Sequence, residues 1–293
     1  MTTRRTALSL LGTALAAPAA NADKPMLNHF YATVDASTYA AVEASTFLRD
    51  QFAPFEKRTT VRNDSTYSGL YFYGDQTYFE FFEENQGDRK PGDAGVALGL
   101  ETATGSDRLR AAWQRLRPSV TTMVTRQLDG NPIDWFQMTS FEETRAQSAV
   151  EGLRLFAMQY APGFVQRWNP AGGASIEQRA ILAAYCAKLK LTEARDTSLL
   201  ENVKRLVIAA PEDGVRVRAA QLKAAGWGVA QRGASIRCQG PNAEVVFQFA
   251  PTRQGVVEVE FSLKRAVAKA THQIGRTTLE ISPARRAVWR LRP

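Results

Sequence analysis

The order of its strand-like and helix-like segments constrains the fold of this chain more than any other feature. A strand pattern over residues 27–34 is followed by a helix pattern over 37–51 and by strand patterns over 55–62, 67–73 and 76–82. The same order then repeats, with a strand at 95–101, a helix at 106–117 and strands at 119–128, 133–140 and 153–160. We therefore predict an α+β fold that contains two tandem βαβββ units.

A third unit of the same kind follows a break in the pattern. Residues 163–201 contain a loop-like stretch, a helix pattern over 175–191 that Ser175 and Gln178 are expected to cap, and a polar connector. A strand at 203–210 and a helix at 212–225 come next. Strands at 227–231, 235–239, 244–249 and 256–263 follow, with one or two short strands within 277–291. We expect a two-unit domain at residues 26–162, a loop–helix connector at 163–201, and a third βαβββ-like unit with C-terminal strands at 202–293.

The first 22 residues have the pattern of an export signal peptide. Arg4 and Arg5 precede a short apolar stretch, and an A-x-A cleavage signal ends at Ala22. The paired arginines resemble a twin-arginine signal, but Ala7 stands where a large apolar residue is usual, so the general secretory route stays open. We expect an exported, periplasmic protein. No apolar run approaches the ~20 residues that span a bilayer, so no membrane span is expected.

Charge and motif content limit the kinds of partner and cofactor that we expect for this protein. The net charge is +8, with much of it near the C-terminus. This is either a surface for an anionic partner or a solvated basic face, and because no nucleic-acid motif accompanies it we expect no nucleic-acid partner. No Walker loop or Gly-rich dinucleotide motif is present, so no nucleotide cofactor is expected. Whether Cys186 and Cys238 pair, and whether the protein forms a homodimer, are left open.

His29 and Glu80 lie in the middle of two apolar strand patterns, MLNHFYATV and QTYFEFF. Because strand side chains alternate, Leu27, His29, Tyr31 and Thr33 are expected on one face. If the faces of the neighbouring strands converge, a His and a Glu lie in an aromatic cup that is lined by Tyr31, Tyr67, Tyr71, Tyr73 and Tyr78. Such a cup suits a small organic molecule. The alternative is a structural histidine and a glutamate that faces solvent.

The paired units, with a His in the first strand and a Glu in the last strand of unit one, resemble the vicinal oxygen chelate superfamily. That superfamily includes glyoxalase I, extradiol dioxygenases and bleomycin-resistance proteins. The segments LNHFYATVD and TYFEFFE are similar to its opening and acid-bearing strands, and they also resemble an uncharacterised, glyoxalase-like bacterial family. The resemblance implies sheets curled into half-barrels around a cup, with a divalent metal held by first and last strands.

By this resemblance His29 and Glu80 are metal ligands and catalytic groups, and Gln159 is the nearest match in unit two. The first strand of unit two, GVALGLE, departs from the pattern because it has Leu98 and no histidine near the expected position. Metal binding is therefore left open. An enzyme of this kind is a divalent-metal lyase, isomerase or oxygenase. The alternative is a non-catalytic protein of the same fold that binds or sequesters a small molecule.

Overall fold

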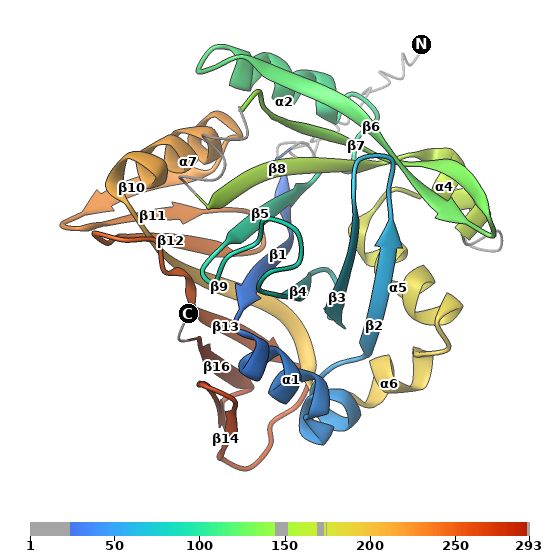
Figure 1. Cartoon of the computed structure of the whole chain (residues 1–293), viewed down its shortest axis with the longest axis vertical. Helices are drawn as coiled ribbons and strands as arrows, with labels where there is room; N and C mark the ends of the chain where they lie inside the picture. Colours follow the sequence, from blue (N-terminus) through green and yellow to red (C-terminus); the bar gives the residue numbers. More distant parts are fainter. Residues whose placement is uncertain (1–23, 144–151, 169–172, 174, 292–293) are drawn as a thin grey trace, which may run out of the picture.

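The computed structural model describes residues 24–143, 152–168, 173 and 175–291. Its strands form two mixed, eight-stranded sheets, the first built from β1–β8 and the second from β9–β16 (Figure 1). The predicted α+β class is confirmed. Among the described residues, no helix is long and apolar enough to cross a membrane.

Two βαβββ units lie side by side in the first sheet. Unit one contains β1 (Met26–Val34), α1 (Ala36–Ala44), β2 (Phe55–Val61), β3 (Thr66–Tyr73) and β4 (Tyr78–Glu83). Unit two contains β5 (Ala94–Gly99), α2 (Gly105–Gln114), β6 (Ser119–Leu128), β7 (Asn131–Phe141) and β8 (Leu153–Tyr160). The first strand of each unit pairs in parallel with the last strand of the same unit. A parallel pair requires a connection that returns to the starting edge of the sheet, and α1 and α2 lie in these connections.

The first sheet is curled so far that its two outermost strands meet at one corner. The strand order is β2-β3-β4-β1-β5-β8-β7-β6, which leaves β2 and β6 at the ends. Arg62, next to β2, nevertheless forms an isolated antiparallel bridge with Arg126 of β6. The Asn63 side chain accepts a hydrogen bond from the backbone N–H of Thr125 at 3.4 Å. The sheet therefore has an inner face, which carries His29, and an outer face, which packs against α1, α2 and the second sheet.

The second sheet has the order β10-β11-β12-β9-β13-β16-β15-β14. Its elements are β9 (Leu200–Ala210), α7 (Glu212–Ala224), β10 (Gly228–Arg232), β11 (Ser235–Gln239), β12 (Glu244–Phe249), β13 (Gly255–Leu263), β14 (Ala270–Ile274), β15 (Thr277–Ser282) and β16 (Arg286–Arg290). β9 pairs in parallel with β12, and α7 lies in the connection between β9 and β10. β13 instead pairs antiparallel with β16. β14 consequently starts at the edge of the sheet where β13 ends. The short loop 264–269 is therefore long enough to connect these two strands without a helix.

One hydrophobic core joins the two sheets. The ring of Phe79, on the outer face of the first sheet, lies 5.3 Å from Phe261 and 6.0 Å from Trp289 of the second sheet, measured between ring centroids. Trp113 of α2 is fully buried, and its indole N–H donates to the Gln221 carbonyl of α7 at 2.9 Å. Burying each large apolar side chain contributes about 1.5–3 kcal/mol, so these contacts hold the sheets together.

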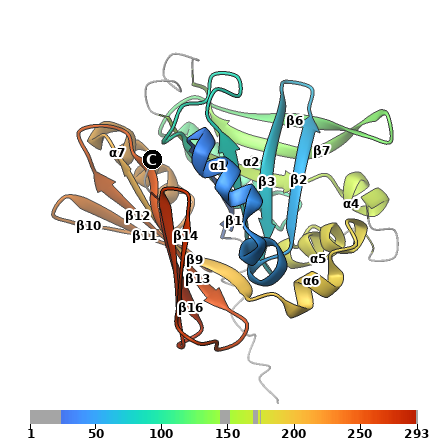
Figure 2. The ribbon, with the colours of Figure 1, turned by 60° about the horizontal axis from the view of Figure 1, so that its bottom comes forward.

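The segment between the sheets covers the inner face of the first sheet. It contains α4 (Pro162–Trp168), α5 (Gln178–Lys188) and α6 (Thr192–Thr197), and α5 and α6 lie beside β2 in both views (Figures 1 and 2). Leu182 and Cys186 of α5 pack against three inner-face tyrosines, Tyr71, Tyr73 and Tyr78. The stretches at α4 and α6, predicted as loop and connector, are helical. The inner face is thus covered by the chain's own helices.

Several local predictions were wrong at segment ends. α5 begins at Gln178, whose backbone N–H donates to the Glu101 carboxylate at 2.7 Å, so the expected Ser175–Gln178 capping box does not form. The helix predicted over 37–51 ends early as α1 and continues as a π-helical turn, Leu48–Phe52. His272 lies on β14, which the sequence did not predict, and its ring stacks on Phe47 at 3.6 Å.

Cys186 and Cys238 are both buried and free. The export signal predicted at 1–22 lies outside the described residues.

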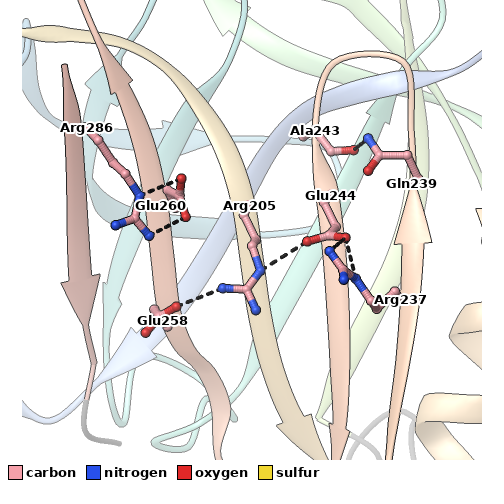
Figure 3. Close-up of polar contacts among 8 residues, drawn as sticks. All are labelled: Arg205, Arg237, Gln239, Ala243, Glu244, Glu258, Glu260 and Arg286. Carbon is pink, nitrogen blue, oxygen red and sulfur yellow. Dashed lines mark hydrogen bonds and ion pairs between the residues drawn. The ribbon is translucent and has the colours of Figure 1, made fainter. Parts of the chain in front are cut away.

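Charged side chains cross the second sheet as alternating ion pairs (Figure 3). Arg205 on β9 lies between Glu244 of β12, at 3.1 Å, and Glu258 of β13, at 3.0 Å. Further pairs flank this centre on either side: Arg237–Glu244 at 2.6 Å, Arg286–Glu260 at 2.7 Å and Arg290–Glu280 at 2.7 Å. Four arginines thus face four glutamates. Arg286 and Arg290 of the C-terminal strands are thus paired with glutamates on the same sheet.

Candidate functional site

A β-bulge in β1 sets the direction of His29. The register of β1 against β5 shifts between Leu27 and His29, so Asn28 is an extra residue in the strand. Leu27 consequently joins the core of the outer face, and its predicted place beside His29 was wrong. His29 and Tyr31 keep the predicted alternation and lie on the inner face. The Asn28 side chain turns toward α5, where its amide donates to the side-chain oxygen of Gln178.

This bulge also fixes the proton on the imidazole. Nδ1 of His29 lies 2.7 Å from Oδ1 of Asn28, an oxygen that can only accept, so Nδ1 carries the proton and Nε2 keeps its lone pair. The ring stacks on Tyr78, with a centroid distance of 4.4 Å. Burial lowers the pKa of His29 to about 3, so the imidazole is neutral near pH 7. His29 therefore presents a fixed acceptor to the inside of the cup.

Glu80 lies opposite that acceptor. Its Oε1 is 3.8 Å from Nε2 of His29, beyond hydrogen-bonding distance. Burial raises the pKa of Glu80 to about 7, although Arg58 and Arg89 oppose this rise. The pair thus combines a neutral imidazole with a carboxyl group that exchanges its proton near neutral pH, which is a combination suited to proton transfer.

The tyrosines predicted for the cup lie around this pair. Tyr71, Tyr73 and Tyr78 are buried, whereas Tyr31 and Tyr67 are partly exposed. The hydroxyl of Tyr73 donates to Glu56 at 2.6 Å, and the Arg58 guanidinium lies 4.0 Å from the centre of the Tyr71 ring. The inner face is therefore aromatic, with arginines placed among the rings.

Gln159, the weakest of the expected ligands, does not join the pair. Its side chain accepts from the backbone N–H of Ser106 at 3.0 Å and donates to the carbonyl of Ala103 at 3.1 Å, so it holds the start of α2. Leu98 is buried in the outer-face core. Gln159 and Leu98 each neighbour a residue that points to the inner face. Because successive strand side chains alternate between faces, an error of one residue in the expected position places the side chain on the outer face.

The strand register shows which residues of unit two correspond to the pair. His29 pairs with Ala97 across the centre of the sheet. On β1, Tyr31 comes two residues after His29 and pairs with Glu80 of β4. On β5, Gly99 comes two residues after Ala97 and pairs with Met158 of β8. Unit two thus offers a methyl and a thioether at these places. The described residues contain no group of three or more His, Cys, Asp or Glu that could hold a metal ion.

The sequence reasoning missed the arginines and the residues that come from the connector. Arg58 follows Glu56 by two residues on β2, so strand alternation could have placed it on the same face. Arg126, Trp168 and Tyr185 meet only through tertiary packing of β6, α4 and α5, for which the sequence pattern offers no signal.

The fold and the inner face define the class: an α+β protein whose first sheet combines two βαβββ units around a cup, the arrangement of the vicinal oxygen chelate superfamily that the sequence resembles. The chain belongs to the family described as "Family of unknown function (DUF5829)", whose model matches residues 27–291. A search of curated proteins found no match.

Several solved structures resemble this chain at low sequence identity. A hypothetical protein from Staphylococcus aureus is 9% identical with a TM-score of 0.55, and the match covers 88% of this chain and 98% of that chain. An Mn(II)-bound glyoxalase from Novosphingobium aromaticivorans is also 9% identical, with a TM-score of 0.43 and coverage of 88% and 77%. A 2,2',3-trihydroxybiphenyl 1,2-dioxygenase from Sphingomonas wittichii is 8% identical, with a TM-score of 0.46 and coverage of 90% and 89%. The likeness to the Staphylococcus aureus protein, at 9% identity, describes the fold and not the activity.

Proposed function

We propose that this protein handles a small organic molecule on the inner face of the first sheet, with His29 and Glu80 as the reactive pair. The observation that carries the proposal is that two buried groups lie 3.8 Å apart with pKa values shifted in opposite directions. The imidazole is neutral, and the pKa of the carboxyl group is raised to about 7. Isolated polar groups are costly to bury, so such a pair in an aromatic interior indicates a functional site.

In this proposal Glu80 moves a proton and His29 positions the substrate. Nε2 of His29 accepts a hydrogen bond from a hydroxyl of the ligand, because Asn28 keeps the proton on Nδ1. The Glu80 carboxylate takes a proton from the ligand, and the protonated acid returns one. The ring of Tyr78 stacks on His29 and limits its movement. Proton transfer of this kind serves an isomerase or a lyase.

A divalent-metal enzyme is the second candidate. The 3.8 Å between Nε2 and Oε1 is less than twice a typical metal–ligand distance of ~2.1 Å, so both atoms can bind one ion. The hydrogen bond from Nδ1 to Asn28 is of the kind that orients metal-binding histidines. When bound, the ion would polarise a ligand oxygen, as in lyase, isomerase or oxygenase chemistry. The unit-two positions Ala97 and Met158 add no oxygen or nitrogen ligand, so the donor set fits a metal only in part.

A binding protein without turnover is the alternative. The observation that favours it is the cover: Leu182 and Cys186 of α5 pack directly on the inner-face tyrosines. Such a protein would enclose an aromatic ligand beside the His29–Glu80 pair and release it unchanged.

Metal content and ligand binding separate the metal enzyme from the two metal-free candidates. We would purify the mature protein and measure bound divalent metal, then repeat with His29→Ala and with Arg237→Gln as a distant surface control. Catechol, with vicinal oxygens, and resorcinol, with separated oxygens, serve as probes in calorimetry. Stoichiometric metal that is lost only in His29→Ala supports the metal enzyme. Metal-free protein that binds catechol through Glu80, with the binding lost in Glu80→Gln, supports the acid–base pair or the binding protein. A protein that holds neither metal nor probe contradicts the proposal.

We further propose export directed by residues 1–22, and a third βαβββ unit within residues 202–293. Support for the first is the sequence pattern around Arg4 and Arg5, and for the second the element order β9-α7-β10-β11-β12. Fusion of residues 1–22 to a reporter, compared with Arg4→Lys/Arg5→Lys, tests the export route; a reporter that stays inside the cell with both sequences contradicts it. Light scattering of the purified protein tests whether it forms a homodimer.

A further inference from the structure

Arg126 is a buried cation in an unusual setting. It lies on β6 at the corner where β2 and β6 meet, and it is only 9% exposed. Its guanidinium carbon is 4.7 Å from the ring centre of Trp135 and 5.3 Å from that of Trp168. One of its nitrogens donates to the hydroxyl of Tyr185 at 3.4 Å. Aromatic rings thus enclose the guanidinium, and these contacts only partly replace the water it has lost.

This arginine has no carboxylate partner among the described residues. Other arginines with little exposure do have one: Arg218 pairs with Glu143 at 2.6 Å, and Arg58 pairs with Glu56 at 2.9 Å. The Nε atom of Arg126 is buried and makes no hydrogen bond. Because an uncompensated buried charge is strongly destabilising, Arg126 is the one of these three that calls for a partner beyond the described residues.

A second orphan donor lies beside it. The indole nitrogen of Trp168 is also buried without a hydrogen-bond partner. The nearby hydroxyl of Tyr185 already accepts from Trp135, at 3.0 Å, as well as from Arg126. The cluster formed by Arg126, Trp135, Trp168 and Tyr185 therefore has donors in excess of acceptors. The group that completes such a set is an oxyanion, which accepts several N–H bonds at once.

The cluster and the His29–Glu80 pair belong to one aromatic wall. Ring contacts run from His29 to Tyr78 at 4.4 Å, from Tyr78 to Tyr73 at 5.9 Å, and from Tyr73 to Tyr185 at 6.3 Å. Tyr185 in turn contacts Arg126. A ligand with a planar body and an anionic group can lie along this wall with one end at each site.

We propose that Arg126, with the indole of Trp168, binds the anionic group of an aromatic small molecule whose body lies along the wall toward Glu80. This inference rests on the proposed function and names the class of its ligand: an aromatic carboxylate or phosphate. The bidentate geometry of a guanidinium suits either oxyanion. To admit the ligand, α4 and α5, which carry Trp168 and Tyr185, shift without separating these side chains from Arg126.

The test uses benzoate, phenyl phosphate and the neutral isostere benzamide, titrated into the mature protein in calorimetry and by tryptophan fluorescence. We expect saturable binding of at least one anion, weaker binding of benzamide, and a preference that shows which oxyanion fits. Arg126→Gln should weaken anion binding about tenfold or more, whereas the exposed Arg237→Gln should leave it unchanged. Benzamide that binds as tightly as benzoate and phenyl phosphate, or anion binding that is unchanged in Arg126→Gln, overturns the inference.

Four further variants keep the result interpretable. Trp168→Phe removes the second orphan donor but keeps the ring, so it should weaken anion binding about two- to fivefold without changing the melting temperature. If Arg126→Gln does not fold, Arg126→Lys keeps the charge and should retain anion binding that Arg126→Met lacks; equal binding by these two contradicts the inference. Glu80→Gln separates this inference from the proposed function. Benzoate binding that survives in Glu80→Gln while the catechol response is lost shows that the two sites act independently.

Discussion

Replacing His29 and Glu80 one at a time should uncover two opposite pH dependences of stability that cancel in the native chain. Burial lowers the pKa of His29 from 6.5 to about 3 and raises the pKa of Glu80 from 4.5 to about 7. Both side chains are buried, so the shifts act on the free energy of unfolding with little screening by solvent.

The signs follow from which state binds the proton. The folded state keeps His29 neutral, so its contribution is present above pH 6.5 and is lost as the pH falls toward 3. The folded state keeps Glu80 protonated, so its contribution is present below pH 4.5 and is lost as the pH rises to about 7. Each slope is about 1.4 kcal/mol per pH unit, and between pH 4.5 and 6.5 the two are opposite. Each group alone therefore changes stability by about 3 kcal/mol over this range.

Urea unfolding followed by circular dichroism, with EDTA present, measures this directly. The free energy of unfolding of Glu80→Gln minus that of wild type should rise by about 3 kcal/mol from pH 4.5 to 6.5. For His29→Gln the same difference should fall by a similar amount. All other titrating groups are common to the three proteins and cancel in these differences. A flat difference for Glu80→Gln would refute the reasoning, because it would mean that Glu80 titrates alike in both states.

Three further outcomes test the packing. Gly95→Ala places a Cβ 2.0 Å from the ring of Tyr31, so we expect a loss of about 1–3 kcal/mol in urea unfolding; unchanged stability would show that the ring moves aside freely. Trp113→Phe removes one of two donors to the buried carbonyl of Gln221, which also accepts from the backbone N–H of Ala225 at 3.1 Å, and should cost about 0.5–1.5 kcal/mol, with a value near zero arguing against the indole hydrogen bond. Both cysteine thiols are buried, so Ellman's reagent should react far more slowly with native than with unfolded protein, and equal rates would contradict their burial.

Much of the first sheet could be predicted from the sequence because its signals are local. The bounds of β6 and β8 match the predicted strands at 119–128 and 153–160, since turn residues and a two-residue alternation mark strands without reference to the rest of the chain. α6 escaped prediction because it buries none of its residues and so lacks an apolar face. α4 carries a signal that was available, a proline at its first position, but the segment is short.

The candidate site was predictable only in part, because the sequence does not show the register in which the strands pair. His29 and Glu80 stand out because polar residues in apolar strands are rare. The bulge at Asn28 and the true unit-two positions, Ala97 and Met158, depend on how strands pair, which no local pattern shows. The setting of Arg126 depends on helices that arrive from a distant part of the chain.

The shared core has a consequence for the order in which the protein can be made. Phe79 of β4 and its neighbours are covered by Phe261 and Trp289, which lie close to the end of the chain. During synthesis on the ribosome, the first half therefore carries an uncovered aromatic surface until the last strands emerge. Chaperones that shield such surfaces should bind the nascent chain throughout that interval, and a truncation before β13 should leave a protein that depends on them permanently.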